Sequence, residues 1–550
     1  MTAIRAAEAT KGHSRRRARP HTPQRPGDPP VDGPRRRHAP LSQQRAPSAL
    51  VTLPTTQPGP SPPLPLQTPR PHSPDAVAVL GARYGYHRDE LYYRAAGEHL
   101  AWGYDDQPPL VVLLARAETA LFGDSPTALR TASAAAVAAT VLLVGLIARE
   151  LGGGTRAQVL AALAWAVAPL TVISGHLLST TTLDLLAWTL ISWLVVRLVR
   201  TRAHRLWLVI GLVTGVGLLN KYLVAFLVVA LLAGLLSAGP RTVLRTPWLP
   251  AGAALALLIS LPVLLWQATH GWPQFELAHA IAEDGDQGGR VGFLPFQLLL
   301  TGPLTAPLWA VGLWQLGRAE RLRPYRLFVW SYGALALVFL VTGGKAYYQG
   351  GAYPVLLAAG ALTVEEWLAR AGRGAWRRVR TGTVAVSGAV TVLIGLPVVP
   401  LAAFADSPQP AVNGDSAETV GWPQLAATVG RVYRTLPPAE RAATTIVTRN
   451  YGEAGALARY GDAYGLPTAY SGHNAYHRWG PPPPDRRAVT LYVGARSAGE
   501  LLRYWREVEP AARIDNGYGV DNEEQGAGVW ICRGLREPWP EIWPAFRHLG

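Results

Sequence analysis

The sequence predicts an α-helical polytopic membrane domain followed by a C-terminal α/β domain. Hydrophobic residues make up 49% of the 550 residues, and only 16% are charged. Between residues 126 and 404 the apolar residues collect in runs of roughly 17–25 residues, the length of helix that crosses a bilayer. Residues 405–550 show shorter apolar runs separated by polar turns, which is typical of a soluble domain.

Residues 1–75 are rich in Pro, Arg, Ser and Gln and show no apolar period. We expect them to form a disordered tail, because this composition cannot bury a core. No continuous apolar core follows the basic residues, so the tail does not resemble a secretory signal. The transmembrane domain is then expected over residues 76–404 and the external domain over residues 405–550.

We expect about 10–11 spans, since ten apolar segments can be counted in the sequence. Residues 205–238 are interrupted only by Asn220 and Lys221, and one helix of that length would measure roughly 50 Å, too long for a ~30 Å core. The sequence therefore predicts two short spans and a tight turn there. The candidate segments are 126–149, 157–175, 181–199, 205–219, 222–238, 248–269, 293–316, 325–342, 350–369 and 381–404.

The loops between these segments alternate in charge, and by the positive-inside rule the basic loops are expected to be cytoplasmic. The basic loops are Ala148–Arg156, Arg197–Arg205, Pro240–Arg245, Gly317–Arg326 and Ala369–Arg380. The loops expected to face outward, together with the C-terminal domain, are Arg83–Ser125, Ser174–Thr180, Asn220-Lys221, Ala282–Gly289 and Gly343–Gly351.

The net charge of +16 lies largely in the tail and in the short basic loops. This distribution is explained by membrane topology and argues against a nucleic-acid partner. The single cysteine, Cys532, excludes an intramolecular disulfide framework and a cysteine-rich metal site.

The start of the membrane domain is inconsistent with this topology. A basic tail on the inside and an outward loop from Arg83 require a span between them, but only Asp75–Tyr86 is available, and it is too short. Either a first helix is missing from this chain or its start is anomalous. We expect a frame or start-site error upstream of about residue 76.

In the C-terminal domain, Thr444–Thr448 and Ala488–Gly494 have the composition of strands. Leu425–Leu436 and Ala498–Val508 have the apolar spacing of amphipathic helices. The domain is therefore predicted to be α/β.

The unusual polar residues fall in the segments expected to face outward. The first outer loop contains HRDELYY (His87–Tyr93) and WGYDDQPPL (Trp102–Leu110), and Asp184 lies just inside a span. A carboxylate at membrane depth costs about 2.5–3.5 kcal/mol, so it normally faces a protein interior or a water-filled cavity. Asp184 is thus either a site residue or a structural partner of an arginine.

Lysine is rare in this chain: the 52 basic residues include only Lys11, Lys221 and Lys345. Lys221 and Lys345 occur in outward turns, where the topology rule disfavours positive charge. An ammonium suits a phosphate, so we interpret both as phosphate ligands at the outer face. The alternative is that they snorkel to lipid headgroups.

Aromatic and histidine residues allow two interpretations each. Tyr347, Tyr348 and Tyr353 line a sugar or lipid site, or form part of an interfacial tyrosine belt. His473 and Asn474 hold an acceptor, or belong to a packed turn. The histidines show no convincing metal-ligand spacing, so no cofactor is certain and a divalent metal stays possible.

The order of these motifs resembles that of the GT-C membrane glycosyltransferases. The elements are an Asp-Glu pair, an acidic residue before Pro-Pro-Leu, a Leu-Asp, the pair Asn220-Lys221, and KAYY (Lys345–Tyr348). The closest branch is the protein O-mannosyltransferase and aminoarabinose-transferase superfamily, and within it the bacterial family 39-type proteins. The resemblance covers about residues 83–370.

This resemblance implies a GT-C fold and inverting transfer of a sugar from a polyprenyl-phosphate donor to a protein, glycan or glycolipid acceptor at the outer membrane face. Asp89 matches the catalytic acidic residue of the family. In the aminoarabinose branch a Glu-Lys pair precedes Pro-Pro, whereas this chain has Asp106-Gln107. The missing lysine puts a role in transfer of aminoarabinose to lipid A in doubt.

The chemistry fits the role that the resemblance implies for Asp89, which is to take the proton of the acceptor hydroxyl. Lys221 and Lys345, with Arg88 nearby, could supply the positive charge that stabilises the departing phosphate. Glu90 points about 100° away on a helix and is expected to pair with Arg94 at i+4. The candidate catalytic residues are Asp89, Glu90 and Asp184. The candidate substrate-binding residues are Arg88, Asp106, Gln107, Lys221, Lys345, Tyr347, Tyr348, His473 and Asn474.

Two other functions stay open at this stage. A transporter or flippase also uses many spans and intramembrane charges, but its site normally lies near the midplane. The third function is that of an inactive sugar-binding homologue, in which the external domain would carry the function. Besides the donor and acceptor, membrane lipid is an expected partner.

Overall fold

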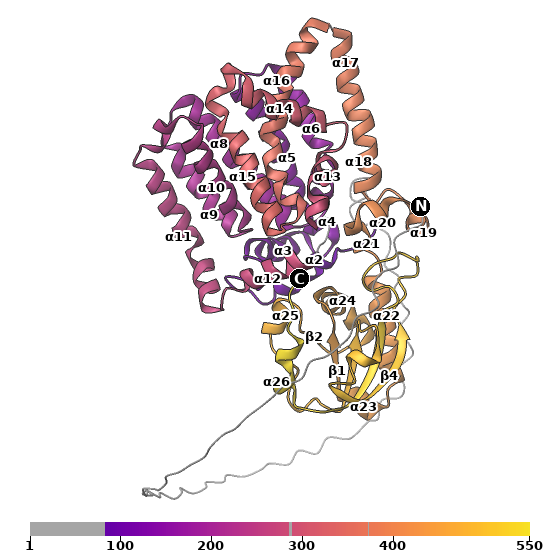
Figure 1. Ribbon diagram of the computed structural model, residues 1–550. Coiled ribbons are helices and arrows are strands. Elements are labelled where there is room, and N and C mark those ends of the chain that lie inside the picture. The colour runs from indigo at the N-terminus through magenta and orange to yellow at the C-terminus, as the bar shows by residue number, and fades with distance from the viewer. Residues whose placement is uncertain (1–82, 285–288, 372) are drawn as a thin grey trace, which may run out of the picture. The chain divides into compact units, whose positions relative to one another are not determined.

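The computed structural model describes residues 83–284, 289–371 and 373–550 (Figure 1). The predicted tail at 1–75 and the expected start error lie outside these residues, as does part of the predicted acidic loop at 282–289.

Helices make up most of every predicted apolar segment, so the helical fold class is confirmed. Asn220 and Lys221 lie in a break between two helices, as predicted. The helices of this region are α4 (Pro126–Leu129), α5 (Thr131–Glu150), α6 (Thr155–Ala166), α7 (Pro169–Gly175), α8 (Thr180–Thr201), α9 (Leu206–Leu218), α10 (Leu223–Ser237), α11 (Trp248–Thr269), α12 (Pro273–Asp284), α13 (Gly289–Thr301), α14 (Ala306–Arg318), α15 (Leu327–Thr342), α16 (Tyr353–Ala371), α17 (Arg373–Gly382) and α18 (Gly388–Gly395).

Among the described residues, three helices are long and apolar enough to cross a membrane: Pro126–Glu150, Thr180–Thr201 and Trp248–Thr269. The number rises to five if each of two bent pairs is one span, α6 with α7 (59°) and α13 with α14 (105°). Pro169 opens α7, and Gly302 with a φ of 86° interrupts the second pair. Proline and a left-handed glycine both end a helix, which explains these bends.

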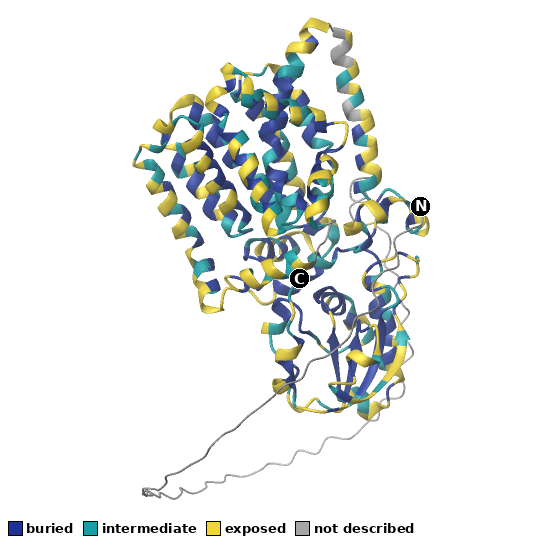
Figure 2. Ribbon diagram, viewed as in Figure 1, coloured by how far each residue is buried: buried dark blue, intermediate teal, exposed yellow. Residues whose placement is uncertain are grey.

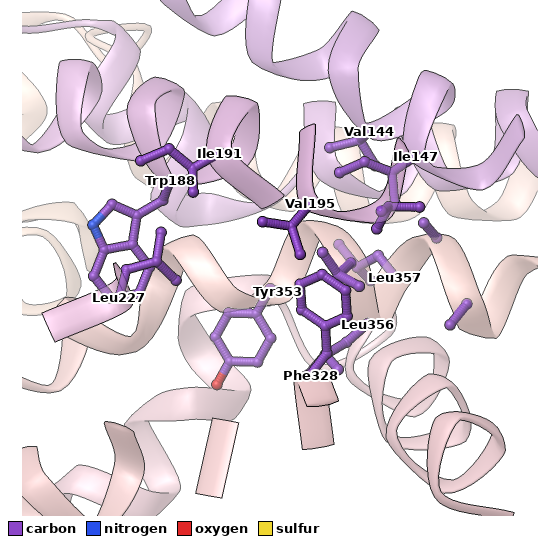
Figure 3. Close-up of a cluster of buried hydrophobic side chains, with 14 of the residues drawn as sticks. Val144, Ile147, Trp188, Ile191, Val195, Leu227, Phe328, Tyr353, Leu356 and Leu357 are labelled. Atoms are coloured by element: carbon purple, nitrogen blue, oxygen red, sulfur yellow. The ribbon is translucent and has the colours of Figure 1, made fainter. Parts of the chain in front are cut away.

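The apolar core of the helical region surrounds α16. Figure 3 shows side chains of α5, α8, α10, α15 and α16 meeting there. The first ten residues of α16, Tyr353–Leu362, are all buried, so this helix is enclosed by the others. Figure 2 shows exposed positions along α11, where Leu257 and Leu258 are 60% and 67% exposed. An outer face of this kind suits contact with lipid.

The five basic loops gather at one end of the helices. Glu150 accepts hydrogen bonds from Arg197 and Arg200, and Arg202 donates to Thr242. The Gly154 amide donates to Glu365 at 2.8 Å. Arg321 donates to Glu366, which joins the fourth basic loop to the end of α16. The basic loops therefore lie together at one end of the helical region, as the alternation of loop charge in the sequence predicts.

The sequence predicts an outward loop over Arg83–Ser125. In the structure this segment also contains two helices, α2 (Arg88–Ala96) and α3 (Leu110–Phe122). The inner face of α2 shares one apolar core with α22 and β1 of the C-terminal part. Leu91 and Tyr92 of α2 and Val429 and Ile446 of the C-terminal part are members of that core.

The C-terminal part contains a five-stranded sheet of order β2-β1-β3-β5-β4. β1 is parallel to β2 and β3, whereas β5 is antiparallel to β3 and β4. The strands are β1 (Thr444–Thr448), β2 (Ala469–Ser471), β3 (Val489–Val493), β4 (Trp505–Arg513) and β5 (Gly528–Leu535). The helices around it are α19 (Leu401–Phe404), α20 (Gln409–Val412), α21 (Gly414–Ala417), α22 (Trp422–Thr435), α23 (Pro438–Ala442), α24 (Tyr451–Tyr460), α25 (Ala475–Arg478) and α26 (Trp539–Ile542).

The predictions of β1, β3 and α22 are confirmed, but the helix expected over Ala498–Val508 is wrong. Residues 498–500 form one 3-10 turn, and β4 begins at Trp505. Leu501 and Trp505 are four residues apart, as on a helical face, yet both enter the same apolar cluster from a tight turn and a strand. Pairing with β5 decides the conformation here, since short apolar patterns do not distinguish helix from strand.

Helices α14 and α16 approach closely through two glycines. A Cβ added to Gly312 would collide with the backbone oxygen of Leu356, and one added to Gly360 would collide with that of Leu308. Because backbone atoms are the obstacle, only a shift of a whole helix would relieve the collision.

We expect Gly312→Ala to lower the free energy of unfolding by about 1–3 kcal/mol, the usual effect of overpacking. Gly317→Ala on the same helix is the matched control, because no heavy atom lies within 4 Å of its Cβ position. The measurement is the thermal denaturation midpoint of each purified variant in detergent. Equal midpoints for the two variants would contradict this packing.

Candidate functional site

The candidate site begins at the first turn of α2, whose start is fixed by its own sequence. His87 precedes the helix, and its Nδ1 accepts a hydrogen bond from the Asp89 amide at 3.2 Å. The His87 amide donates to Glu90 Oε2 at 2.8 Å, which completes a capping box. Both acidic residues thus lie in the first turn, where the helix dipole stabilises negative charge.

Glu90 is fully buried and satisfied by four donors. Arg130 donates from Nε (2.8 Å) and Nη2 (2.7 Å), and the amides of Leu178 (3.0 Å) and His87 (2.8 Å) also donate. Burial raises the pKa of a carboxyl group, but the Arg130 guanidinium and these hydrogen bonds outweigh it and hold the pKa of Glu90 below its usual value. The geometry gives Glu90 a structural role.

The expected pairing of Glu90 with Arg94 is wrong. Arg94 binds Asp124 instead, with its Nε 2.9 Å from Asp124 Oδ2. Glu90 is fully buried, whereas the Arg94 side chain is partly exposed and already paired, so the buried Arg130 takes its place as the partner of Glu90.

Asp89 points away from Glu90 and towards the C-terminal part. Its Oδ1 accepts a hydrogen bond from the Tyr451 hydroxyl at 2.8 Å, and its side chain stays 33% exposed. Arg88 lies 4.8 Å from the centroid of the Tyr451 ring and donates to Glu523 at 2.5 Å. A partly exposed carboxylate fixed at one oxygen keeps its other oxygen available for a substrate.

Tyr451 reaches Asp89 because α24 packs closely against α2. A Cβ on Gly455 would lie 2.9 Å from Leu91 Cβ, and one on Gly452 would lie 3.1 Å from Arg88 Cβ. The two glycines are three residues apart and therefore lie on one face of α24. A larger residue at either position would move Tyr451 away from the carboxylate.

Asp106 lies within electrostatic reach of this carboxylate, and Gln107 follows it in the chain. Asp106 Oδ1 accepts a hydrogen bond from the Tyr92 hydroxyl at 2.7 Å, and burial raises its pKa to about 7. The charge of Asp89 also acts on Asp106. Gln107 is buried, and its Nε2 has no hydrogen-bond partner among the described residues.

Lys221 lies in the break between α9 and α10, at the end of the helices opposite to the basic loops. Its Nζ donates to Thr181 Oγ1 at 3.3 Å and lies 5.1 and 5.2 Å from the ring centroids of Tyr347 and Tyr348. These distances are within the range of cation–π contacts. The two tyrosines and one lysine are therefore brought together.

Asp184 and Lys345 lie close enough to Lys221 for their charges to act on it. Asp184 is 6% exposed and lies one turn after Thr181 on α8, and the ionic charge acting on it is that of Lys221. The arginine partner left open for Asp184 is not found among the described residues. Lys345 immediately precedes the 3-10 turn Ala346–Ala352 that carries both tyrosines.

The charge of Asp89 connects the part of the site on α2 with the part around Lys221. The charge of Asp89 acts on Lys221 and on Tyr347. The structure therefore assembles Asp89, Asp106, Lys221, Tyr347 and Tyr451 from five separate segments of the chain.

His473 and Asn474 lie on the far side of Tyr451. The His473 ring is 4.7 Å from the Tyr451 ring and stacks on His548, and its Nε2 is 2.8 Å from the Gly550 oxygen. Asn474 is buried with a φ of 50° and accepts a hydrogen bond from the Gly550 amide. These contacts are those of the packed turn that the sequence left as an alternative.

Two residues of the site region were missed by sequence reasoning, Tyr451 and Asp105. Asp105 is 1% exposed and accepts hydrogen bonds from Arg478 at 2.6 and 2.8 Å, so it ties the loop of Asp106 to α25. Tyr451 lies in NYGEAGAL (Asn450–Leu457), directly after Asn450, which caps α24.

No group of three or more His, Cys, Asp or Glu residues in the described part of the chain has the geometry to hold a metal ion. The arrangement offers a partly exposed carboxylate, a half-buried acid with a raised pKa, and a lysine beside two tyrosine rings. It suits acid–base chemistry on a substrate that carries a negative group.

Comparisons with known proteins agree with this fold. Residues 106–266 match the family model of the dolichyl-phosphate-mannose-protein mannosyltransferases. The structure is similar to that of ArnT from Cupriavidus metallidurans in the apo state, with a TM-score of 0.54 and 15% identity over 82% of this chain and 94% of that chain. ArnT bound to undecaprenyl phosphate gives a TM-score of 0.52 and 16% identity over 82% and 95%. No curated protein matches the chain. The resemblance to GT-C glycosyltransferases is confirmed at the level of the fold.

We expect Glu90→Gln to destabilise the protein by about 3–5 kcal/mol, because it leaves Arg130 charged, buried and without its carboxylate. Glu98→Gln is the control, since Glu98 is 75% exposed and pairs with Arg116 at the surface. Thermal denaturation in detergent compares the two. A Glu90→Gln midpoint as high as that of the control would contradict the structural role.

The acid stability of the protein gives an independent readout of the same contact. Because the pKa of Glu90 is lowered in the folded state, its contribution is complete above the usual value near 4.5 and is lost as the pH falls through the lowered pKa.

Proposed function

We propose that this chain, a membrane protein with the GT-C glycosyltransferase fold, transfers a sugar from a polyprenyl-phosphate donor to an acceptor hydroxyl, with inversion. The observation that carries the proposal is that Lys221 lies against the rings of Tyr347 and Tyr348 at one end of the helices, within electrostatic reach of Asp89. A carboxylate for the acceptor and cations for the donor lie within electrostatic reach of each other.

The donor class is supported by the charge and the relatives. Lys221 and Lys345 are positive groups at the end of the helices without the basic loops, and a lipid phosphate would neutralise them. Tyr347 and Tyr348 offer aromatic faces for a sugar or for the first isoprene unit. ArnT of Cupriavidus metallidurans, which shares the fold, has a structure with undecaprenyl phosphate bound.

The reaction follows from these positions. Asp89 takes the proton of the acceptor hydroxyl as that oxygen attacks the anomeric carbon. The bond between the anomeric carbon and the phosphate oxygen breaks on the opposite face, and its electron pair leaves on the phosphate. Lys221 and Lys345 stabilise that charge, while Tyr451 holds one oxygen of Asp89 in place. Attack and departure on opposite faces invert the anomeric centre.

The site end of the helices is proposed to be the outer face of the cell membrane, with the C-terminal part outside. The gathering of the basic loops at the other end supports this orientation. Protein, glycan and glycolipid hydroxyls all fit the chemistry as acceptors. Asp106-Gln107 offers no lysine before Pro-Pro, which disfavours transfer of aminoarabinose to lipid A.

The direct test is transfer by the purified chain in nanodiscs. A polyprenyl-phosphate sugar that accumulates in a deletion strain, identified by mass spectrometry, supplies the donor. Release of polyprenyl phosphate with glycosylation of an acceptor supports the enzyme. Movement of the intact donor between leaflets would indicate a flippase, and binding without turnover would indicate an inactive homologue.

We expect Asp89→Asn to lower the transfer rate by roughly 10²–10⁴, the usual contribution of a general base. Asparagine keeps the shape and the hydrogen bond to Tyr451 but cannot take the proton. Asp485→Asn, at an exposed position of the C-terminal part, is the control. Near-normal turnover by Asp89→Asn would exclude this residue as the base.

We expect Lys221→Ala and Lys345→Ala each to weaken use of the lipid donor about 10–150-fold, because each removes a charge-assisted contact of about 1.5–3 kcal/mol. Acceptor affinity should change little. The measurement is transfer rate against donor concentration, with Lys11→Ala as the control. Unchanged donor dependence with reduced thermal stability would instead indicate snorkelling lysines.

A further inference from the structure

A basic groove of about 510 Å³ lies between the segment after α10 and the segment before α15. Its lining includes two hydroxyl side chains, Ser237 and Thr242. It also includes four arginines: Arg241, Arg245, Arg323 and Arg326. None of these residues belongs to the candidate site.

The groove lies at the opposite end of the helices from the candidate site. α10 (Leu223–Ser237) begins two residues after Lys221 and ends at Ser237 of the groove. α15 (Leu327–Thr342) begins directly after Arg326 of the groove and ends three residues before Lys345. The two helices pack together, since Ser331 Oγ donates to the Ala230 oxygen at 2.9 Å. With 15 and 16 residues at about 1.5 Å each, they separate the two places by roughly 22–24 Å.

The positive charge of the groove is poorly balanced. Glu320 is 77% exposed and lies 3.3 Å from Arg326 and 3.9 Å from Arg323. Arg245 is exposed and has no ion pair within the described part of the chain. The Nε of Arg326 is buried and has no hydrogen-bond partner among the described residues. Only two of the four guanidinium groups pair with this one exposed carboxylate, which leaves positive charge for an anion.

The floor of the groove is fixed rather than loose. Arg202 ends α8 with a φ of 57°, a left-handed conformation that favours glycine, and its side chain donates to Thr242. Trp207 Nε1 donates to the Val243 oxygen at 2.9 Å. Both contacts hold the short turn Arg241–Leu244 in place.

The surroundings of the groove are those of a membrane interface. Leu236, beside Ser237, is 56% exposed. Arginine–tryptophan pairs occur at this end of the helices, with Arg205 5.4 Å from the Trp248 ring and Arg318 4.4 Å from the Trp314 ring. Tryptophan and arginine at this level are typical of headgroup depth.

We propose that this groove binds the phosphate of an anionic phospholipid headgroup, on the membrane face opposite to the candidate site. The arginines take the phosphate, for which their planar groups are suited. The Thr242 hydroxyl, which accepts a hydrogen bond from Arg202, donates to a phosphate oxygen. The exposed apolar surface at Leu236 takes the start of an acyl chain. Basic pockets between transmembrane helices bind acidic lipid headgroups in this way.

The test uses the full chain in nanodiscs of phosphatidylcholine with or without phosphatidylglycerol. The double variant Arg245→Gln with Arg323→Gln is compared with Arg149→Gln with Arg318→Gln, which removes the same charge from exposed positions outside the groove. We expect phosphatidylglycerol to raise the denaturation midpoint by about 3 °C or more in the wild type and in the control only. Native mass spectrometry should show roughly tenfold less retained phosphatidylglycerol for the groove variant.

Equal stabilisation of both double variants would show a general charge effect and overturn the site. Stabilisation of the wild type by millimolar inorganic phosphate in phosphatidylcholine alone, to the same extent, would overturn the lipid assignment. If the groove variant does not fold, each single variant is expected to lose part of the retained lipid. Full retention by both single variants would then overturn the proposal.

Discussion

The carboxylate of Glu90 is the contact on which the candidate site depends. It is fully buried and joins the start of α2 to Arg130 before α5 and to the Leu178 amide before α8. Breaking a buried pair of this kind is costly, so α2 has one position and one rotation. Since neighbours on a helix point about 100° apart, fixing Glu90 inward directs Asp89 outward. Glu90 anchors α2 in the protein, whereas Asp89 stays accessible for the proposed reaction.

The second constraint is that the site needs the C-terminal part. Asp89 and the lysines come from the helical region, whereas Tyr451, which holds the carboxylate, comes from α24. The small residues Gly452 and Gly455 allow α24 to approach α2, and the shared apolar core of Leu91, Val429 and Ile446 keeps it there. Docking of the C-terminal part and positioning of the proposed base are therefore one structural event.

Much of this organisation is predictable from the sequence, because it depends on local patterns. Apolar run length locates the helices, loop charge separates their two ends, and the rarity of lysine singles out Lys221 and Lys345. Contacts between distant segments are not predictable in this way. Tyr451 and Asp89 are 362 residues apart, and Glu90 meets Arg130 rather than the nearer Arg94. β4 forms where the end of a helix was expected, because it pairs with β5. That pairing joins two separate segments, so the local pattern does not reveal it.

The central claim is that Tyr451 acts on the reaction through Asp89, and a double-mutant cycle on the transfer rate tests it most directly. Tyr451→Phe removes the hydroxyl but keeps the ring, and we expect it to slow transfer about tenfold or more in the wild type. With asparagine already at position 89 the proton acceptor is gone, so adding Tyr451→Phe should slow transfer no further, within about twofold. Losses that multiply in the double variant would contradict the account, because Tyr451 would then act independently of Asp89.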